Sequence, residues 1–380
     1  MEKKELLKRW QPWSTRGRRG PGRATAAADP RLIGGSMNDR FVRVARSGAE
    51  EQIAHVSLVR HASAEGLVAR VYDQLERDFG ILAPPVILHS PVPDLLAAVW
   101  MMLRETLVAT GRADRAAKEA AAAAVSLGNS CPYCVAAHST TLHGLVRGRD
   151  AAAIAAGRLG DIGDPHIRAV AGWGERFGTP GAPERPFPPE QAPEIVGTAF
   201  VFHYYNRMVN IFLGESPFPP NAPARAHGAV SRVVGRLMAA SSRARHAPGE
   251  SLDLLPAAPA SGDLPWTAGN EVIADAFARA SAVIDRAGER VVPEPVRDLL
   301  VAELAGWDGR TAEPARIDEA VDGLPAPDRP AGRLVLLTAL ASYRVGPAVI
   351  AEFRRDDGAD ARLLECLAWA AFTAARAATA

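Results

Sequence analysis

The sequence predicts an all-α protein, and three observations favour this fold class. Alanine is abundant, apolar residues recur at three- and four-residue spacing along most of the chain, and no segment has the alternating pattern of a β-strand. The 380 residues are long enough for two domains, or for one large domain with a decorated core. Alanine-rich faces allow neighbouring helices to approach closely, so we expect a tightly packed helical core.

Helices are expected to follow one another from about residue 64. In the first half the expected helices are 66–80, 95–111, 115–127, 131–143, one starting at 165, and 194–213. In the second half they are 224–245, 270–290, 296–307, 333–343 and 359–378. Asp94, Asp114 and Ser130 each precede a helical segment, so we expect these side chains to cap the free N–H groups.

The chain is expected to divide into four parts. Residues 1–63 form a basic leader that we expect to be disordered, or to include an extension upstream of a natural start at Met37. Residues 64–246 form the expected catalytic helical domain. Residues 247–265 contain four prolines and are the best candidate for a linker. Residues 266–380 form a second helical domain.

A weak internal similarity relates the two helical halves. An offset of 246 places Asp114 on Asp360 and Glu119 on Glu365, within helices of similar alanine-rich character. The same offset places both cysteines of the first half on alanines. The second half is then either a degenerate repeat that lost the chemistry, or a chance match between two alanine-rich helices.

Composition excludes several classes of function. The net charge is +1 and no stretch approaches the roughly 20 apolar residues of a membrane helix, so we expect no nucleic-acid or membrane partner. The basic N-terminus lacks the apolar region of a secretory signal. Cys131, Cys134 and Cys366 are the three cysteines, too few for a disulfide-stapled secreted scaffold. We therefore expect a cytoplasmic protein.

The chemistry is expected at Cys131, Cys134 and His138. The two cysteines belong to a Cys-Pro-Tyr-Cys motif near the start of a helix, and all three side chains project from one face because steps of three and four residues are neighbours there. A thiolate attacks, a second thiol closes a disulfide, and an imidazole moves the proton. Glu119, on the preceding helix, is the right residue type to orient the imidazole.

Two other interpretations of the motif remain open. Zinc could bind the two thiols and the imidazole, with Glu119 as a fourth ligand, although structural zinc sites usually draw on two separated ligand pairs. The cysteines could also be purely structural. For Cys366, which stands alone in an apolar helix, the structural interpretation is favoured.

The motif belongs to a longer pattern. Its segments are LERDFG at 75–80, HSP at 89–91, Lys118-Glu119, CPYCVAAH at 131–138 and AFVFHYYNRMVNIFLG at 199–214. This pattern resembles the alkylhydroperoxidase D family of the carboxymuconolactone decarboxylase-like superfamily. The resemblance covers about residues 65–215, and its most specific feature is the spacing from Glu119 through the cysteine pair to His138.

The resemblance implies an all-helical bundle with a disulfide-cycling site and no cofactor. It implies reduction of a hydroperoxide with electrons from a dithiol reductant protein, in a homo-oligomer. Carried onto this chain, Glu119, Cys131, Cys134 and His138 form the relay, in which Cys134 attacks the peroxide and Cys131 resolves. The helix dipole alone would favour Cys131 as the more acidic thiol, whereas the nearer imidazole favours Cys134.

One departure and two alternative functions complete the expectations. Some family members have a histidine just before the second cysteine, where this chain has Tyr133, so a proton relay through that position is in doubt.

The chain could instead be a non-catalytic or zinc-bound helical scaffold that partners another enzyme. It could also be an enzyme of the same fold that acts on a specialised metabolite.

Overall fold

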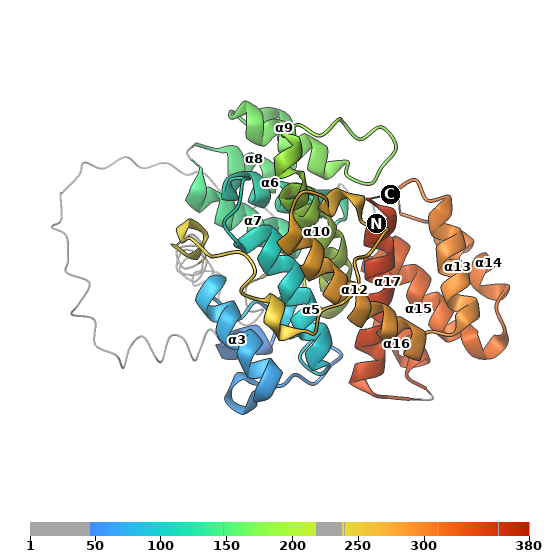
Figure 1. Cartoon of the computed structure of the whole chain (residues 1–380). Coiled ribbons are helices and arrows are strands. Elements are labelled where there is room, and N and C mark those ends of the chain that lie inside the picture. Colours follow the sequence, from blue (N-terminus) through green and yellow to red (C-terminus); the bar gives the residue numbers. More distant parts are fainter. Residues whose placement is uncertain are drawn as a thin grey trace, which may run out of the picture.

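The computed structural model describes residues 46–146, 148–217, 238, 240–309, 311–355 and 357–379. These residues are mostly helical and include no strand, which confirms the predicted all-α class (Figure 1). Residues 1–45 of the predicted leader and most of the predicted helix 224–245 lie outside the described residues. Within the described ranges, no helix combines the length and apolar character that a membrane span requires.

The helices are named as in Figure 1. In the first half they are α3 (Gly66–Asp78), α4 (Pro84–Ile87), α5 (Pro93–Leu103), the π-helical turn η3 (Arg104–Val108), α6 (Arg115–Gly128), α7 (Pro132–Leu145), α8 (Asp150–Ala155), α9 (Pro165–Glu175) and α10 (Ala192–Phe212). In the second half they are α12 (Glu271–Val291), α13 (Glu294–Ala305), α14 (Pro314–Asp322), α15 (Arg329–Ala341), α16 (Pro347–Phe353) and α17 (Asp360–Ala377).

Capping was predicted correctly for α6 and incorrectly for α5. The Asp114 carboxylate accepts the Ala117 N–H at 2.8 Å, as expected of an N-cap. Asp94 instead lies inside the first turn of α5, because Pro93 already occupies the first helical position and Val92 precedes it. There Asp94 is placed favourably at the positive end of the helix dipole without capping an N–H group.

The long helix α10 is the centre of the molecule. It is buried along nearly its whole length and packs against α6 on one side and α17 on another (Figure 1). Helix α5 also packs against α12. One hydrophobic cluster therefore includes side chains that precede residues 247–265 in the sequence and side chains that follow them. The predicted division into domains stays a prediction, but the two halves share a core.

Order begins earlier than residue 64. Residues 46–63 are described, and the Arg46 guanidinium pairs with the Glu76 carboxylate of α3 through two hydrogen bonds of 2.6 Å. The Ala54 N–H donates to the carbonyl of Phe212 at the end of α10, at 2.9 Å. The last part of the predicted leader therefore makes specific contacts with the first helical half, and the boundary at residue 63 stays a prediction.

The predicted linker is fastened to the core at its beginning. The buried Arg104 guanidinium forms ion pairs with Asp78 and Glu105, and a further pair with Glu250 of the linker at 2.8 Å. Glu105 also accepts the N–H of Gly249 at 2.7 Å. A buried guanidinium needs such partners because an unpaired buried charge is costly.

The predicted internal repeat stays a prediction, and the packing adds to its support. The corresponding helices α6 and α17 both pack against α10. Their matched carboxylates differ in setting: Glu119 contacts His138 and Arg115, whereas Glu365 pairs with Arg290 of α12.

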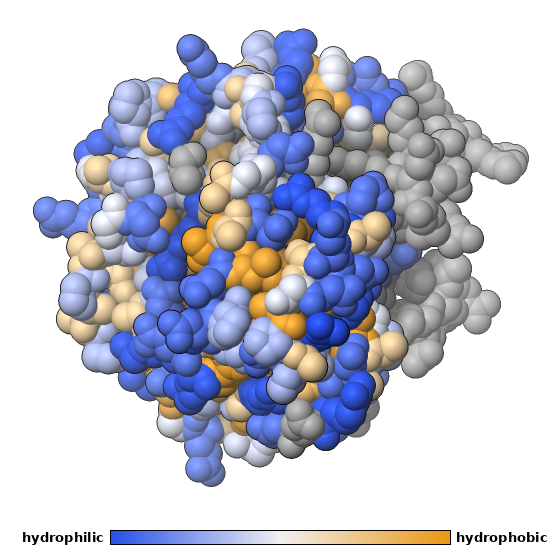
Figure 2. Space-filling view, turned by 90° about the vertical axis from the view of Figure 1, so that its right-hand side faces the viewer, coloured by the Kyte–Doolittle hydropathy of each residue, from blue (hydrophilic) through white to orange (hydrophobic). Residues whose placement is uncertain are grey.

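The face that carries α13 to α16 is mostly hydrophilic, with some apolar side chains gathered near its centre (Figure 2). Among the described residues, the large apolar side chains that are exposed are Val301 and Tyr343. Nearly all large apolar side chains of the described chain therefore lie wholly or partly in the core.

We expect Gly288→Ala to destabilise the fold, because Gly288 lets α12 approach α17 closely. A Cβ at this position would lie 2.1 Å from the indole of Trp369. Overpacking of this kind costs about 1–3 kcal/mol, which denaturant unfolding would measure. Gly172→Ala in α9 is the matched control, since its Cβ would meet no atom within 4 Å and helix propensity favours alanine. Equal losses in the two variants would contradict the close approach.

Candidate active site

A tight turn between α6 and α7 places the cysteine pair. Ser130 lies two residues after the end of α6 and has a positive φ of 55°, a left-handed conformation that is uncommon for residues other than glycine. The Cys131 N–H then donates to the Ser126 carbonyl at 2.9 Å. Cys131, not the predicted Ser130, is therefore the N-cap residue of α7, because Ser130 is used to reverse the chain.

Both thiols of the motif are buried beside each other. Cys131 is fully buried, Cys134 is 2% exposed, and both are free cysteines. The two side chains belong to the same small buried cluster, and Cys131 helps to raise the pKa of the Cys134 thiol. Tyr133 and Val209 pack against them, with the partly buried Leu213 at the edge of this cluster. The expected proximity of the two thiols is thus present.

The expected contact between Glu119 and His138 is also present. Glu119 Oε2 lies 2.6 Å from His138 Nδ1, and Arg115 Nε donates to Glu119 Oε1 at 2.8 Å. Burial alone would raise the pKa of the Glu119 carboxyl, but the charge of Arg115 and the contacts with His138 lower it overall. An ionised carboxylate accepts the Nδ1 proton, which leaves Nε2 as the proton acceptor of a neutral imidazole.

The imidazole of His138 is also held by packing. Its ring meets the ring of Phe202 edge-on, with centroids 4.4 Å apart. His138 follows Cys134 by one helical turn on α7, so the two side chains are neighbours on the helix surface. Together with Glu119, these contacts fix the ring beside the thiol pair, where it could exchange a proton with a sulfur directly or through one water.

Three polar residues beside Cys134 were not predicted as part of the site. They are Ser126 and Asn129 of the α6 end and Asn206 of α10, and they form hydrogen bonds with one another. Asn206 thus ties α10 to the end of α6, and Asn206 and Ser126 offset part of the rise in the pKa of Cys134. Ser126 lies two helical turns after Glu119, a spacing that puts both on one face and could have suggested it.

Tyr133 occupies the position where some family members have a histidine just before the second cysteine. Its hydroxyl donates to Gln52 Oε1 of the N-terminal segment at 3.3 Å. Burial and the neighbouring thiols raise the pKa of Tyr133 well above its ordinary value, so the phenol stays protonated. A phenol in this state can donate a hydrogen bond but is a poor general base.

Comparison with known proteins identifies the family. The chain is 40% identical over 326 residues to a protein named alkyl hydroperoxide reductase Rv2159c, from Mycobacterium tuberculosis (strain ATCC 25618 / H37Rv). The aligned part covers 85% of this chain and 93% of that protein. The chain belongs to the alkylhydroperoxidase D-like family. It is thus an alkylhydroperoxidase-like enzyme, and the predicted resemblance is confirmed.

Two further comparisons gave no match for this alkylhydroperoxidase-like chain. No family model matches the sequence, and no solved structure matches it. The family assignment therefore depends on the curated relative and agrees with the all-helical fold. The individual roles of Glu119, Cys131, Cys134 and His138 stay predictions.

The zinc interpretation lacks a suitable ligand arrangement. In the part of the chain that the structure describes, no group of three or more His, Cys, Asp or Glu side chains is placed to hold a metal ion. Glu119 is instead engaged by Arg115 and His138.

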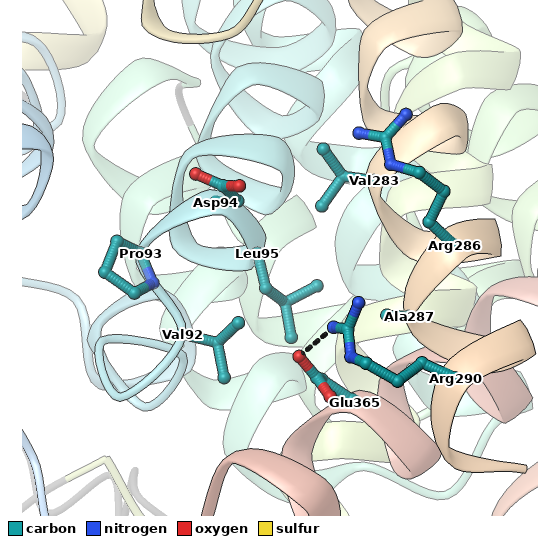
Figure 3. A pocket seen from close by; sticks show the side chains of 9 residues that line it. All are labelled: Val92, Pro93, Asp94, Leu95, Val283, Arg286, Ala287, Arg290 and Glu365. Carbon is teal, nitrogen blue, oxygen red and sulfur yellow. Dashed lines mark hydrogen bonds and ion pairs between the residues drawn. The ribbon is translucent and has the colours of Figure 1, made fainter.

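A surface pocket of about 310 Å³ lies away from the cysteines, between α5, α12 and α17 (Figure 3). Arg286 and Arg290 of α12 line it on one side and Asp94 on the other, with the ion pair between Arg290 and Glu365 at its edge. None of the four predicted catalytic residues lines this pocket, so it does not bear on their chemistry.

In this alkylhydroperoxidase-like chain, we expect the rate of Cys134 alkylation to keep rising with pH well into the alkaline range. Burial is the main cause that raises the pKa of Cys134 well above its ordinary value, and the neighbouring Cys131 raises it further. A raised pKa keeps the thiol protonated at pH values where a free cysteine, with a pKa of about 8.5, is largely ionised. Iodoacetamide labelling followed by peptide mass spectrometry measures the rate at each pH.

Cys366 serves as an internal reference in the same labelling experiment. Cys366 is fully buried and its burial raises its pKa to about 12, so this residue should also stay unlabelled near neutral pH. A plateau in the Cys134 rate below pH 8.5 would contradict the raised pKa. By linkage, the neutral thiol favours the folded state, and that contribution is lost as the pH rises past the pKa of the unfolded thiol.

Proposed function

We propose that this chain is a thiol-dependent peroxidase that reduces hydroperoxides with the Cys131–Cys134 pair and a Glu119–His138 proton relay. The observation that carries the proposal is the 2.6 Å contact between Glu119 of α6 and His138 of α7, the helix that also carries both thiols at its start. The name of the curated relative, alkyl hydroperoxide reductase, supports a hydroperoxide as substrate.

The first step oxidises Cys134. His138 takes the thiol proton, and the thiolate attacks the terminal oxygen of the hydroperoxide while the O–O bond breaks. The alkoxide leaves and receives the proton from His138. The products are an alcohol and a sulfenic acid at Cys134. The ionised carboxylate of Glu119 stabilises the imidazolium that forms in between.

The second step closes a disulfide. The Cys131 thiolate attacks the sulfenic sulfur of Cys134, the S–O bond breaks, and the oxygen leaves as water after taking up a proton. The position of both thiols in one small buried cluster supports this step. A dithiol protein then supplies two electrons by thiol–disulfide exchange and restores both thiols.

The burial of the site sets a requirement on access. Tyr133, Val209 and Leu213 pack against the thiols, so a hydroperoxide and a reductant reach them only when this cover moves. We further propose that the protein works in the cytoplasm as a homo-oligomer, with no nucleic-acid or membrane partner. These proposals depend on the composition and on the family.

Oxidation with one equivalent of hydroperoxide tests the function. The expected result is a protein whose mass is lower by two hydrogen atoms, with a disulfide between Cys131 and Cys134 and a reduced Cys366. Dithiothreitol should restore the mass and support continued peroxide consumption. Protein that keeps all three thiols and consumes no peroxide would refute the proposal.

A structural role for the thiols is the second candidate, and their burial favours it. A thiol that is buried and has a raised pKa, as Cys134 has, is usually inert. In that case the chain would act as a helical scaffold, and peroxide would leave Cys131 and Cys134 unchanged. Metal analysis of the purified protein distinguishes a zinc-bound scaffold from a metal-free one, because the zinc-bound form would carry stoichiometric zinc and few titratable thiols.

A further inference from the structure

The carboxylate of the relay has a second partner, which the mechanism above does not use. Arg115 Nε donates to Glu119 Oε1 at 2.8 Å, and Glu119 Oε2 lies 2.6 Å from His138 Nδ1. Each carboxylate oxygen therefore has its own partner, and Glu119 joins the guanidinium to the imidazole. Glu119 is fully buried and the Arg115 side chain is only 13% exposed, so salt and water screen this ion pair little.

The stability of α6 does not explain an arginine at this position. Arg115 is the first residue of α6, where a cation lies at the positive end of the helix dipole. The pair also runs in the less favourable direction, because an acidic residue stabilises a helix more when it precedes its basic partner by four positions than when it follows it. Residues that break such local rules are expected where a side chain serves a site.

The other charged groups around Glu119 are engaged elsewhere or exposed. The ammonium of Lys118, the preceding residue, pairs with Glu194 of α10 at 3.4 Å. Asp150 of α8 accepts two backbone N–H groups, and the ionisable side chains of α9 are exposed. Among the described residues, the carboxylate of Glu119 thus forms its ion pairs with the guanidinium of Arg115 and the imidazole of α7.

We propose that Arg115 is a positioning residue of the proton relay, whose guanidinium holds the Glu119 carboxylate ionised and directed at the imidazole of His138. The inference rests on the proposed function and deepens it. Without the guanidinium, burial would favour a protonated Glu119. A protonated carboxyl donates to Nδ1 of His138, which leaves the imidazole proton on Nε2, and that nitrogen then cannot take a proton from the thiol.

Arg115→Gln tests the inference through the pH profile of turnover. Peroxide consumption at saturating dithiothreitol should fall about tenfold at neutral pH, as expected for the loss of one hydrogen bond to a charged group. The pH below which turnover is lost should also rise, because Glu119 then takes up a proton more readily. Arg115→Lys keeps the positive charge and should return this limit toward the wild-type pH.

A double-mutant cycle shows whether Arg115 acts through Glu119. In a Glu119→Gln background, Arg115→Gln should change turnover by less than about twofold, because the carboxylate that it would hold is absent. Arg279→Gln is the matched control, since Arg279 of α12 is 15% exposed and pairs at 2.8 Å with Asp275, one helical turn before it. This control should leave turnover and its pH profile unchanged even if stability falls.

The pH dependence of unfolding tests the inference without peroxide. Burial raises the pKa of Glu119, and the charge of Arg115 is the main cause that lowers it. The stability that the ionised carboxylate contributes is lost as the pH falls through its folded pKa. The difference in free energy of unfolding between Arg115→Gln and the Arg115→Gln, Glu119→Gln double variant should therefore be lost at a higher pH than the difference between wild type and Glu119→Gln.

The outcomes distinguish this inference from the proposed function. If Arg115→Gln leaves both the pH profile of turnover and the pH dependence of unfolding unchanged, the inference is overturned. A tenfold loss that persists in the Glu119→Gln background, or an equal loss in Arg279→Gln, overturns it as well, because the effect would then be structural. If wild-type protein consumes no peroxide, the proposed function is refuted, whereas the unfolding measurement still decides whether Arg115 holds Glu119 ionised.

Discussion

Cys134→Ser is expected to abolish peroxide turnover, with a loss of at least about three orders of magnitude. The expected mechanism begins with attack by the Cys134 sulfur, and a serine hydroxyl at this buried position has neither the acidity nor the nucleophilicity of a thiol. The substitution changes little volume at a site that is 2% exposed, so the fold should be retained. Peroxide consumption with dithiothreitol as reductant measures the loss.

Cys131→Ser should give a different result, which separates the two roles. Cys134 would still be oxidised once, so the variant should consume one equivalent of peroxide and accumulate a sulfenic acid that dimedone traps. Cys366→Ser is the control and should turn over at the wild-type rate, because Cys366 is a buried residue of α17. A single-turnover burst in Cys134→Ser and none in Cys131→Ser would reverse the assignment of the two roles.

The parts of the site that could be predicted from the sequence depend on local geometry. Cys131, Cys134 and His138 follow one another at spacings of three and four residues, which a helix brings to one face. Asp114 is the N-cap of the preceding helix, a role that a single aspartate can specify. The contact of Glu119 with His138 could be predicted because a short turn joins their two helices. Interactions of this kind depend on spacing within about 20 residues, which periodicity describes well.

The parts that could not be predicted depend on contacts between distant segments. Asn206 meets Ser126 and Asn129 across nearly 80 residues of sequence, and nothing in the sequence of α10 marks its amide as their partner. Gln52 reaches Tyr133 from a segment whose composition suggested disorder. These contacts arise from how α10 and the N-terminal segment pack, which local propensity does not encode.

The turn before α7 shows a local error with a definite cause. Ser130 is a residue that favours N-caps, and the rule placed the helix start there. The chain instead needs a left-handed residue to turn from α6 into α7, and Ser130 takes that conformation. Cys131 consequently becomes the N-cap residue, which places the backbone of the first thiol at the very start of the helix.

Glu119→Gln should lower peroxide turnover about 100-fold or more, the second largest effect that we expect. The carboxylate accepts the Nδ1 proton of His138 and stabilises the imidazolium, and a neutral amide does neither equally well. An amide can also donate to Nδ1, which would fix the tautomer whose Nε2 carries the proton and cannot accept one. Steady-state peroxide consumption at saturating dithiothreitol measures the loss.

Glu365→Gln is the matched control, because Glu365 is the carboxylate that an offset of 246 relates to Glu119. It is nearly as buried but pairs with Arg290 rather than with a histidine, so turnover should be retained even if stability falls. Similar losses of turnover in both variants would show that the effect at Glu119 is structural and would contradict the relay.

The pH dependence of stability gives a second, independent readout at Glu119. Its pKa is lowered in the folded protein, so the ionised carboxylate contributes stability at pH values above the unfolded pKa of about 4.3. That contribution is lost as the pH falls through the lower folded value. The difference in free energy of unfolding between wild type and Glu119→Gln should therefore be largest near neutral pH and shrink on acidification, and a difference that stays constant down to strongly acidic pH would contradict an ionised Glu119 paired with Arg115 and His138.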